Sequence, residues 1–421
     1  MNLIGRPAWG QASVREPAWL VDTCAWLARL YIISWTISFT VFPVLESAIP
    51  SLRWLSVGGM LLTGIVSHPR HWERGWTILA FLGVILCTAV VNGSGSDSYF
   101  IYIRILAPAV LSFVCGNFDS ENRKKIVDCV MQSASVIVIS SLLLGLVAPE
   151  LAFKMVGLER NRLYGMTSHP AMLGYFGSLT ACWYGCQCIF CSDRLSAKLR
   201  YGLFVCGGIA ATVLADSRTG QISIVATPCM IGYVAVLMKS QYKTSIALPY
   251  TVLASITLIM IVLPILYAEG VLSVGDDEEK YSTRIELWQT GLEVFAENPL
   301  AGNGLASSFY SSDQGANQAP LFYYHTILIN YLAKAGIFGG ISVVLMLLSA
   351  PHAFLRYALC IDQAPQSSHK NHMLCYCASA ITTTTIFSTT EASLQSMYPS
   401  FLIYFLSFNF LSTWQDDSQK A

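Results

Sequence analysis

The chain has 421 residues, of which 54% are hydrophobic and only 12% are charged. A soluble globular domain carries about 25% charged residues, and here the apolar excess is gathered in blocks long enough to cross a bilayer. The composition therefore excludes an ordinary soluble domain and predicts a polytopic membrane protein. The net charge of zero says little about partners, because in such a protein the position of each charge is what carries information.

About twelve apolar runs are long enough to be membrane spans. They cover residues 27–45, 52–67, 76–92, 99–116, 126–148, 170–191, 201–215, 220–238, 246–267, 325–348, 373–388 and 397–411. No small-residue cleavage site closes the first run, so we expect a retained span and no cleaved signal peptide. The predicted fold is all-α, with a single integral membrane domain over residues 1–421.

The positive charges predict the orientation of these spans. With the N-terminus inside, the inner segments hold most of the 25 Lys and Arg residues, which fits the positive-inside rule. We therefore expect both termini in the cytoplasm and one larger outer loop, residues 268–324. Against this rule, four outer arginines gather in three short stretches, which suggests that they bind an anion: Arg160, Arg162, Arg218 and Arg284.

The outer loop is predicted to hold a short amphipathic helix. Thr283 and Glu286 have the T-x-x-E spacing of a capping box, and apolar residues then recur at helical steps. Asn298-Pro299 should end this helix, because the residue before proline is displaced from helical backbone angles. Gly302-Asn303-Gly304 predicts a turn, and His325 lies at the start of the next apolar run.

These stretches resemble the O-antigen ligase and polymerase superfamily. The matching residues are Arg284, Trp288, Asn298-Pro299-Leu300, Gly302, Gly304, His325, Gly336-Ile337-Phe338-Gly339, and upstream Arg162-Leu163-Tyr164-Gly165, His169-Pro170 and Ser217-Arg218-Thr219-Gly220. The motifs run from about residue 160 to 340, and it is their order and shared membrane side that carry the resemblance, since no single motif is specific.

The resemblance implies a membrane enzyme that transfers a glycan from undecaprenyl pyrophosphate to an acceptor sugar hydroxyl on the periplasmic face of a bacterial inner membrane. It implies that Arg218 and Arg284 bind the pyrophosphate, with weaker candidates in Arg162 and Arg160. His325 would be the catalytic base, and its place at the positive end of a helix would keep the imidazole neutral. No metal and no cofactor are implied, and no motif suggests nucleic-acid binding. Besides the glycan substrates, membrane lipids are the expected partners.

Several other residues have two readings. His169, Trp288 and Tyr324 are possible substrate contacts, although a structural role is favoured for His169 and an interfacial role suits most outer aromatic residues. Arg104 and Lys334 fall inside predicted spans, where charged residues are functional suspects, yet the sequence identifies no partner for either. The 13 cysteines lie mostly in apolar blocks and are expected to be packing residues.

Two alternatives remain open at this stage. An O-antigen ligase would use lipid A–core as acceptor, whereas a polymerase of the same superfamily would use a second lipid-linked glycan; the modest outer loop slightly favours a ligase. A lipid-linked glycan flippase is the alternative from another class. Transporters often have paired repeats with broken spans in matching positions, and none is evident in this sequence.

Overall fold

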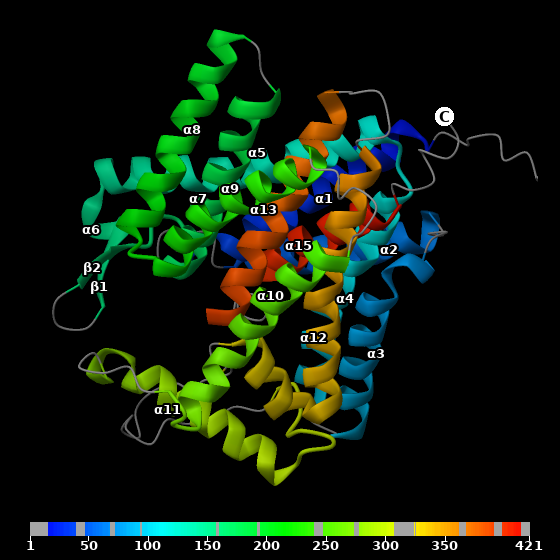
Figure 1. The fold of residues 1–421 in the computed structure, drawn as a ribbon, viewed down its shortest axis with the longest axis vertical. Helices are drawn as coiled ribbons and strands as arrows, with labels where there is room; N and C mark the ends of the chain where they lie inside the picture. The colour runs from blue at the N-terminus through cyan, green and yellow to red at the C-terminus, as the bar shows by residue number, and fades with distance from the viewer. Residues whose placement is uncertain are drawn as a thin grey trace, which may run out of the picture.

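The structure, a computed structural model, describes most of the chain as a helical bundle (Figure 1). The described residues are 16–38, 47–67, 72–92, 95–156, 160–191, 194–239, 247–272, 278–306, 324, 326–361, 368–390 and 398–413. His325 and both chain ends lie outside these ranges, so their predicted roles and positions stay predictions.

The helices follow one another through the whole chain, and the prediction of a helical membrane protein is confirmed. Their bounds are α1 (Ala18–Thr36), α2 (Ala48–Ser67), α3 (Trp76–Val91), α4 (Gly95–Gly116), α5 (Ser120–Val147), α6 (Pro149–Ala152), α7 (Pro170–Cys186), α8 (Leu195–Leu214), α9 (Arg218–Lys239), α10 (Ala247–Ala268), α11 (Glu278–Glu297), α12 (Ile327–Ile361), α13 (Ser368–Thr390) and α15 (Tyr398–Thr413). A 3-10 turn, η2 (Trp72–Gly75), precedes α3, and a π-helical turn, η3 (Gln187–Cys191), follows α7.

Six helices in the described part of the chain are long and apolar enough to cross a membrane. They are α2, α4, α5, α8, α10 and α12. The outer face of α8 exposes apolar side chains such as Leu199 and Leu203, as expected where a helix faces lipid rather than water. Every predicted span overlaps a helix, but the count of about twelve spans stays a prediction.

Small residues bring α7, α8 and α9 into close contact. A Cβ added to Gly174 of α7 would overlap Ser217, and one added to Gly177 would meet Thr212 and the carbonyl of Gly208 on α8. On α9, a Cβ at Gly220 would meet Thr212 again. Such contacts let membrane helices approach backbone to backbone, and they fix the start of α9 against two neighbours.

One part of the all-α prediction is wrong, because the chain between α6 and α7 forms a β-hairpin. Strand β1 (Phe153–Val156) pairs antiparallel with β2 (Arg160–Leu163), with Phe153 opposite Leu163. Four-residue strands are too short to show the alternating pattern that would predict them. The hairpin ends in a turn where Gly165 has a φ of 55° and lies against Ser141 of α5.

The first predicted span, 27–45, has the wrong bounds. Helix α1 begins at Ala18, directly after Pro17, and ends at Thr36. Ile37 is extended and forms a β-bridge with Thr167, while the N–H of Ser38 donates to the carbonyl of Met166. These pairings with the chain after the hairpin take up backbone groups that a longer helix would need.

Candidate functional site

The loop that follows α11 docks into a break in α12. Gly336 interrupts α12 with a φ of 65°, so the N–H of Ile337 bonds outside its own helix, to the carbonyl of Pro299 at 2.8 Å. The carbonyl of Ala333 accepts from Asn303 at 2.9 Å, and that of Lys334 accepts from Gly304 at 3.0 Å. The loop thus satisfies the backbone groups that the break frees, as a membrane interior requires.

Two glycines make this docking possible. A Cβ at Gly302 would overlap the backbone of Lys334 and Ala335, and a Cβ at Gly336 would overlap the backbone of Leu300. Gly302 has a φ of 66° as well, which a residue with a side chain rarely adopts. The N-P-L-x-G-x-G and G-I-x-G stretches of the sequence are therefore two halves of one structural joint.

Two asparagine side chains stabilise the joint by hydrogen bonds to its backbone. Asn298 makes two hydrogen bonds to Gly302. Its side-chain Nδ2 donates to the backbone carbonyl of Gly302 at 2.9 Å, and its backbone carbonyl accepts from the Gly302 N–H at 2.9 Å. Asn92, just past the end of α3, donates its side-chain amide to the carbonyl of Ala301 at 3.1 Å. The helix end at Glu297 and the glycine turn agree with the predictions made from Asn298-Pro299 and Gly302-Asn303-Gly304.

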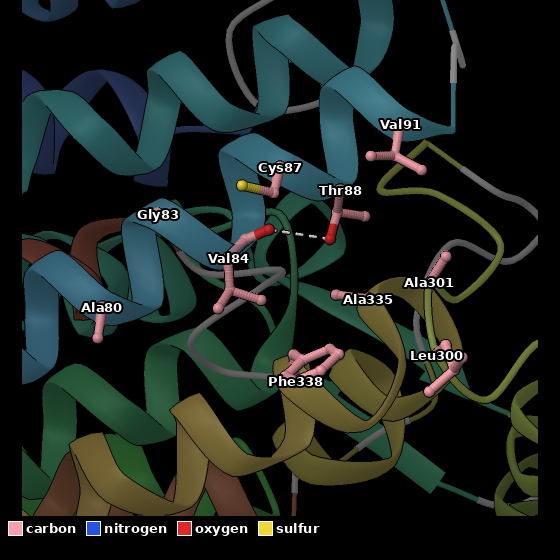
Figure 2. A pocket seen from close by; sticks show the side chains of 10 residues that line it. All are labelled: Ala80, Gly83, Val84, Cys87, Thr88, Val91, Leu300, Ala301, Ala335 and Phe338. Atoms are coloured by element: carbon pink, nitrogen blue, oxygen red, sulfur yellow. Dashed lines mark hydrogen bonds between the residues drawn. The ribbon is translucent and has the colours of Figure 1, made fainter.

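An apolar pocket of about 520 Å³ lies between α3 and this joint (Figure 2). Its lining residues are Ala80, Gly83, Val84, Cys87, Thr88, Val91, Leu300, Ala301, Ala335 and Phe338. The Thr88 hydroxyl already donates to the carbonyl of Val84 at 2.9 Å (Figure 2). The lining suits a hydrocarbon group and offers a sugar or a phosphate very little.

Helix α11 is seated on α10 and α12 at the lower edge of the bundle in Figure 1. The side-chain amide of Gln289 donates to the carbonyl of Ala268, the last residue of α10, at 2.9 Å. Gly291 lies against Ile329 of α12, where a Cβ would have no room. The helix starts at Glu278, so the predicted capping box at Thr283 is wrong: Thr283 lies inside the helix, because helical pairing begins in the acidic segment before it.

Among the predicted site residues, Arg284, Trp288 and Tyr324 belong to this α11–α12 region. Arg284 is half-buried on α11, and Trp288 packs against a small cluster that contains Leu287, Tyr324 and Ile329. Tyr324 is only 2% exposed, and its burial raises the pKa of the phenol, which keeps it neutral. His325 follows Tyr324 directly in the chain and lies outside the described residues.

The second group of predicted site residues surrounds the turn between α8 and α9. Arg218 is the first residue of α9 and is exposed. Ser217 precedes it and caps the helix, since its hydroxyl accepts from the Gly220 N–H at 3.3 Å. Asp216 has a φ of 49°, in the left-handed region. The tight turn predicted at residues 216–219 is confirmed, and it places a guanidinium at the positive end of a helix.

Arg162 of the hairpin holds this turn. Its Nε donates to the carbonyl of Ala215 at 3.0 Å and its Nη2 to the carbonyl of Asp216 at 2.6 Å. The carboxylate of Asp216 lies 3.9 Å from the Arg162 Nε. Two N–H donors of the guanidinium are therefore engaged by protein backbone, and this contact positions the segment that carries Arg218.

His169 and Arg160 lie on either side of Arg162 in the sequence. His169 caps α7, because its Nδ1 accepts from the Ala171 N–H at 3.2 Å. That contact agrees with the structural role favoured for this histidine. Arg160 opens strand β2 opposite Val156, and its proposed contact with phosphate stays a prediction.

Contacts through α3, α4 and α1 connect the two groups. Asn92, which holds Ala301 of the joint, ends α3 shortly before α4 begins. In the first half of α4, the guanidinium of Arg104 lies 5.2 Å from the ring centre of Trp35, near the end of α1. That end of α1 pairs with the turn after the hairpin. The joint and the α8–α9 turn therefore lie toward one end of the bundle.

The two charged residues inside predicted spans have identifiable contacts. Lys334 is 2% exposed and its Nζ donates to the carbonyl of Leu305 at 3.1 Å, which adds a side-chain bond to the joint. Arg104 also faces the ring of Trp54 at 5.4 Å, so it links α4 to both α1 and α2. Neither contact could be read from sequence, because each depends on how distant segments pack.

Part of the chain matches a known protein family. Residues 203–344, from within α8 to the middle of α12, match the family model described as O-antigen ligase. The chain carries an O-antigen ligase domain. This match supports the superfamily of O-antigen ligases and polymerases, as the sequence resemblance predicted. A search of curated proteins finds none that matches the chain.

The O-antigen ligase domain includes most of the candidate site. Arg218, Arg284, Trp288, Tyr324 and the glycine joint lie within the matched residues, whereas the hairpin with Arg160 and Arg162 and the cap at His169 lie before them. The family implies an enzyme that transfers glycans and uses lipid-linked glycan substrates. With several apolar helices, the protein is a multi-pass membrane protein.

Proposed function

We propose that this protein is an O-antigen ligase of the bacterial inner membrane, which transfers a glycan from undecaprenyl pyrophosphate to a hydroxyl of lipid A–core at the periplasmic face. The observation that carries the proposal is the match of residues 203–344 to the O-antigen ligase family. The glycine joint adds a structural reason, because it connects the helix of Arg284 to the helix that follows His325.

In the proposed reaction, His325 takes the proton of the acceptor hydroxyl as that oxygen attacks the anomeric carbon. The bond from this carbon to the pyrophosphate oxygen breaks, and undecaprenyl pyrophosphate leaves with both electrons of that bond. Attack opposite the leaving group inverts the anomeric centre. The leaving group is already a good one, so the transfer needs no nucleotide, metal or cofactor.

Arg218 and Arg284 are the proposed pyrophosphate ligands. A guanidinium is always charged and presents two N–H groups in a plane to phosphate oxygens. The exposure of Arg218 at the start of α9 supports this role, because a helix N-terminus favours an anion as well. Arg160 and Arg162 are proposed as secondary contacts, and the backbone bonds of Arg162 give it a positioning role in addition.

Trp288, Tyr324 and His169 are proposed as contacts to the bound substrates. Trp288 and Tyr324 lie in one packed cluster between α11 and α12, and an aromatic ring offers a sugar an apolar face. The cap that His169 forms at α7 supports a mainly structural part for that residue. We further propose that the whole chain, residues 1–421, is one membrane domain with about twelve spans, that both termini are cytoplasmic, and that the segment 268–324 is periplasmic.

The acceptor decides between a ligase and a polymerase. Purified protein should be incubated with a synthetic undecaprenyl pyrophosphate-linked glycan, either alone or together with lipid A–core. A ligase forms the glycan–core product only in the second mixture. Longer lipid-linked chains in the first mixture would make the protein a polymerase that uses a second lipid-linked glycan. Absence of any transfer, with intact folded protein, would contradict both forms of the proposal and direct attention to lipid transport.

A further inference from the structure

Three polar residues, one directly before α12 and two within it, are spaced one turn apart. Thr326, Asn330 and Lys334 follow one another at intervals of four residues, and each is at most 2% exposed. The hydroxyl of Thr326 accepts from the Ile329 N–H at 3.2 Å, and Lys334 donates to the carbonyl of Leu305 at 3.1 Å. Asn330 differs: its Nδ2 and Oδ1 are both buried, and neither has a hydrogen-bond partner among the residues that the structure describes.

An unpaired amide is costly in a buried position. It gives up hydrogen bonds to water and receives none in return, whereas an apolar side chain of similar size carries no such cost. Asn409 of α15 provides a comparison within the chain. It is 1% exposed, but its amide donates to the hydroxyl of Ser112 at 2.6 Å. The part of the fold that the structure describes therefore explains Asn409 and gives no reason for an asparagine at position 330.

A second unpaired group lies on the neighbouring helix. The indole Nε1 of Trp288 on α11 is buried and has no partner among the described residues. Trp288 packs against the cluster that contains Ile329 and Ala333, which lie one residue before and three residues after Asn330 along α12. Among the described residues, the contact between α11 and α12 thus carries one N–H donor without a partner, one amide without a partner and a half-buried aromatic ring.

We propose that Asn330 and Trp288 form a subsite for a sugar of the acceptor glycan. An amide can both donate to and accept from hydroxyl or N-acetyl groups, the indole N–H adds a donor, and its ring adds an apolar surface. Neither group is charged, so the pair suits a sugar better than a phosphate. Asn330 lies in the first turns of the helix that follows His325, the residue proposed to act on the acceptor hydroxyl. We therefore assign the subsite to the acceptor and not to the donor, and this assignment rests on the proposed function.

The test is the substitution Asn330→Leu, with Asn409→Leu as matched control. In Asn330→Leu, thermal stability in detergent should equal or exceed that of the wild type, because an unpaired amide is removed. The KM for lipid A–core should rise about tenfold, on the order of the net effect of one or two lost hydrogen bonds, with the KM for the lipid-linked donor unchanged. Asn409→Leu should lower the melting temperature instead. Trp288→Phe, which keeps a ring and removes the N–H, should raise the same acceptor KM.

Several outcomes would contradict the proposed sugar subsite. Wild-type acceptor kinetics in a stable Asn330→Leu protein would overturn the inference, as would a rise in the donor KM alone. If leucine impairs folding, Asn330→Ala, which adds no bulk, replaces it in the kinetic measurements, and normal acceptor KM in that variant is again contradictory. Failure of the wild-type protein to transfer any glycan would refute the proposed function instead, so the two failures are distinguishable.

Discussion

Gly302 and Gly336 face each other's chain segments, and neither position has room for a side chain. A Cβ on Gly302 would overlap Lys334, and a Cβ on Gly336 would overlap Leu300. Between them run the three backbone hydrogen bonds that join the loop after α11 to the break in α12. The close approach of the loop after α11 to the break in α12 therefore requires glycine, which has no side chain, at both positions.

Gly302→Ala and Gly336→Ala should both destabilise the protein and reduce transfer. The positive φ alone costs on the order of 1 to 3 kcal/mol for a residue with a side chain, and the overlap with backbone atoms adds to this. Thermal unfolding in detergent and glycan transfer would measure the two effects. Gly58→Ala on α2 is the control, because a Cβ there meets nothing within 4 Å. A normal melting temperature in both joint variants would contradict the joint.

Arg162→Lys should reduce transfer even though it keeps the positive charge. Lysine has one compact ammonium group and cannot reach both carbonyls that Arg162 binds, those of Ala215 and Asp216. The turn should loosen, and Arg218 with it, at a cost on the order of 1 kcal/mol. Arg200→Lys at the exposed start of α8 is the control and should leave turnover unchanged. Undiminished turnover in Arg162→Lys would restrict Arg162 to an ordinary surface role.

Hydrophobic run lengths and turn residues were enough to predict most of the bundle. Each predicted span overlaps a helix, and Asn298-Pro299 and residues 216–219 mark a helix end and a turn as expected. These features depend on local chemistry: the loss of helical geometry before a proline, and the need for unpaired backbone to leave the apolar interior. The predicted start of α1 is wrong, because the first residues of this helix, such as Asp22, are more polar than those of a central span.

The contacts that shape the site could not be predicted in the same way. The glycines at 302 and 336 were visible as motifs, but their mutual contact is a matter of tertiary packing. The same is true of the hydrogen bond from Lys334 to the carbonyl of Leu305 and of the hydrogen bonds from Arg162 to the α8–α9 turn. A buried amide such as that of Asn330, which has no partner among the residues that the structure describes, has no sequence signature, since only packing shows which groups lack partners.

Cysteines placed at positions 218 and 325 should react with an impermeant thiol reagent added outside intact cells. The expectation follows from the charge bias along the chain and from the exposure of Arg218. The background must lack the 13 native cysteines. A cysteine at exposed Arg194, before the other end of α8, should react only after permeabilisation. The reverse labelling pattern would show that the predicted orientation is wrong, and it would contradict a mechanism at the periplasmic face.

Arg218→Lys and Arg284→Lys should each lower turnover strongly, on the order of 10²-fold, the effect of losing one donor to a developing negative charge. A point charge cannot reproduce the planar pair of N–H groups that binds pyrophosphate oxygens. Both variants should insert normally, which blotting of membrane fractions would establish before kinetics. The same change at Arg200 serves as the reference for an exposed arginine outside the site. Near-normal turnover in both Arg218→Lys and Arg284→Lys would mean that pyrophosphate is held elsewhere.

His325→Ala should abolish transfer and leave donor binding nearly intact. The two arginines hold the pyrophosphate before and during its departure, whereas the histidine acts on the acceptor oxygen, so its removal lowers the chemical step and spares donor affinity. Loss of a general base typically costs roughly 10²- to 10⁴-fold in rate. The measurement pairs donor binding with turnover in the purified variant, at matched protein levels.

The outcomes separate three roles for His325. Lost turnover with normal donor binding assigns the base. Loss of both binding and turnover would instead make His325 a donor ligand, or a structural residue at the start of α12. Wild-type turnover would exclude it as the base and shift attention to His169, whose Nδ1 accepts from the Ala171 N–H, so that this nitrogen would have to leave the α7 backbone before it could take up a proton. His169→Ala, measured alongside, tests that route, because it would then lose the transfer that His325→Ala retains.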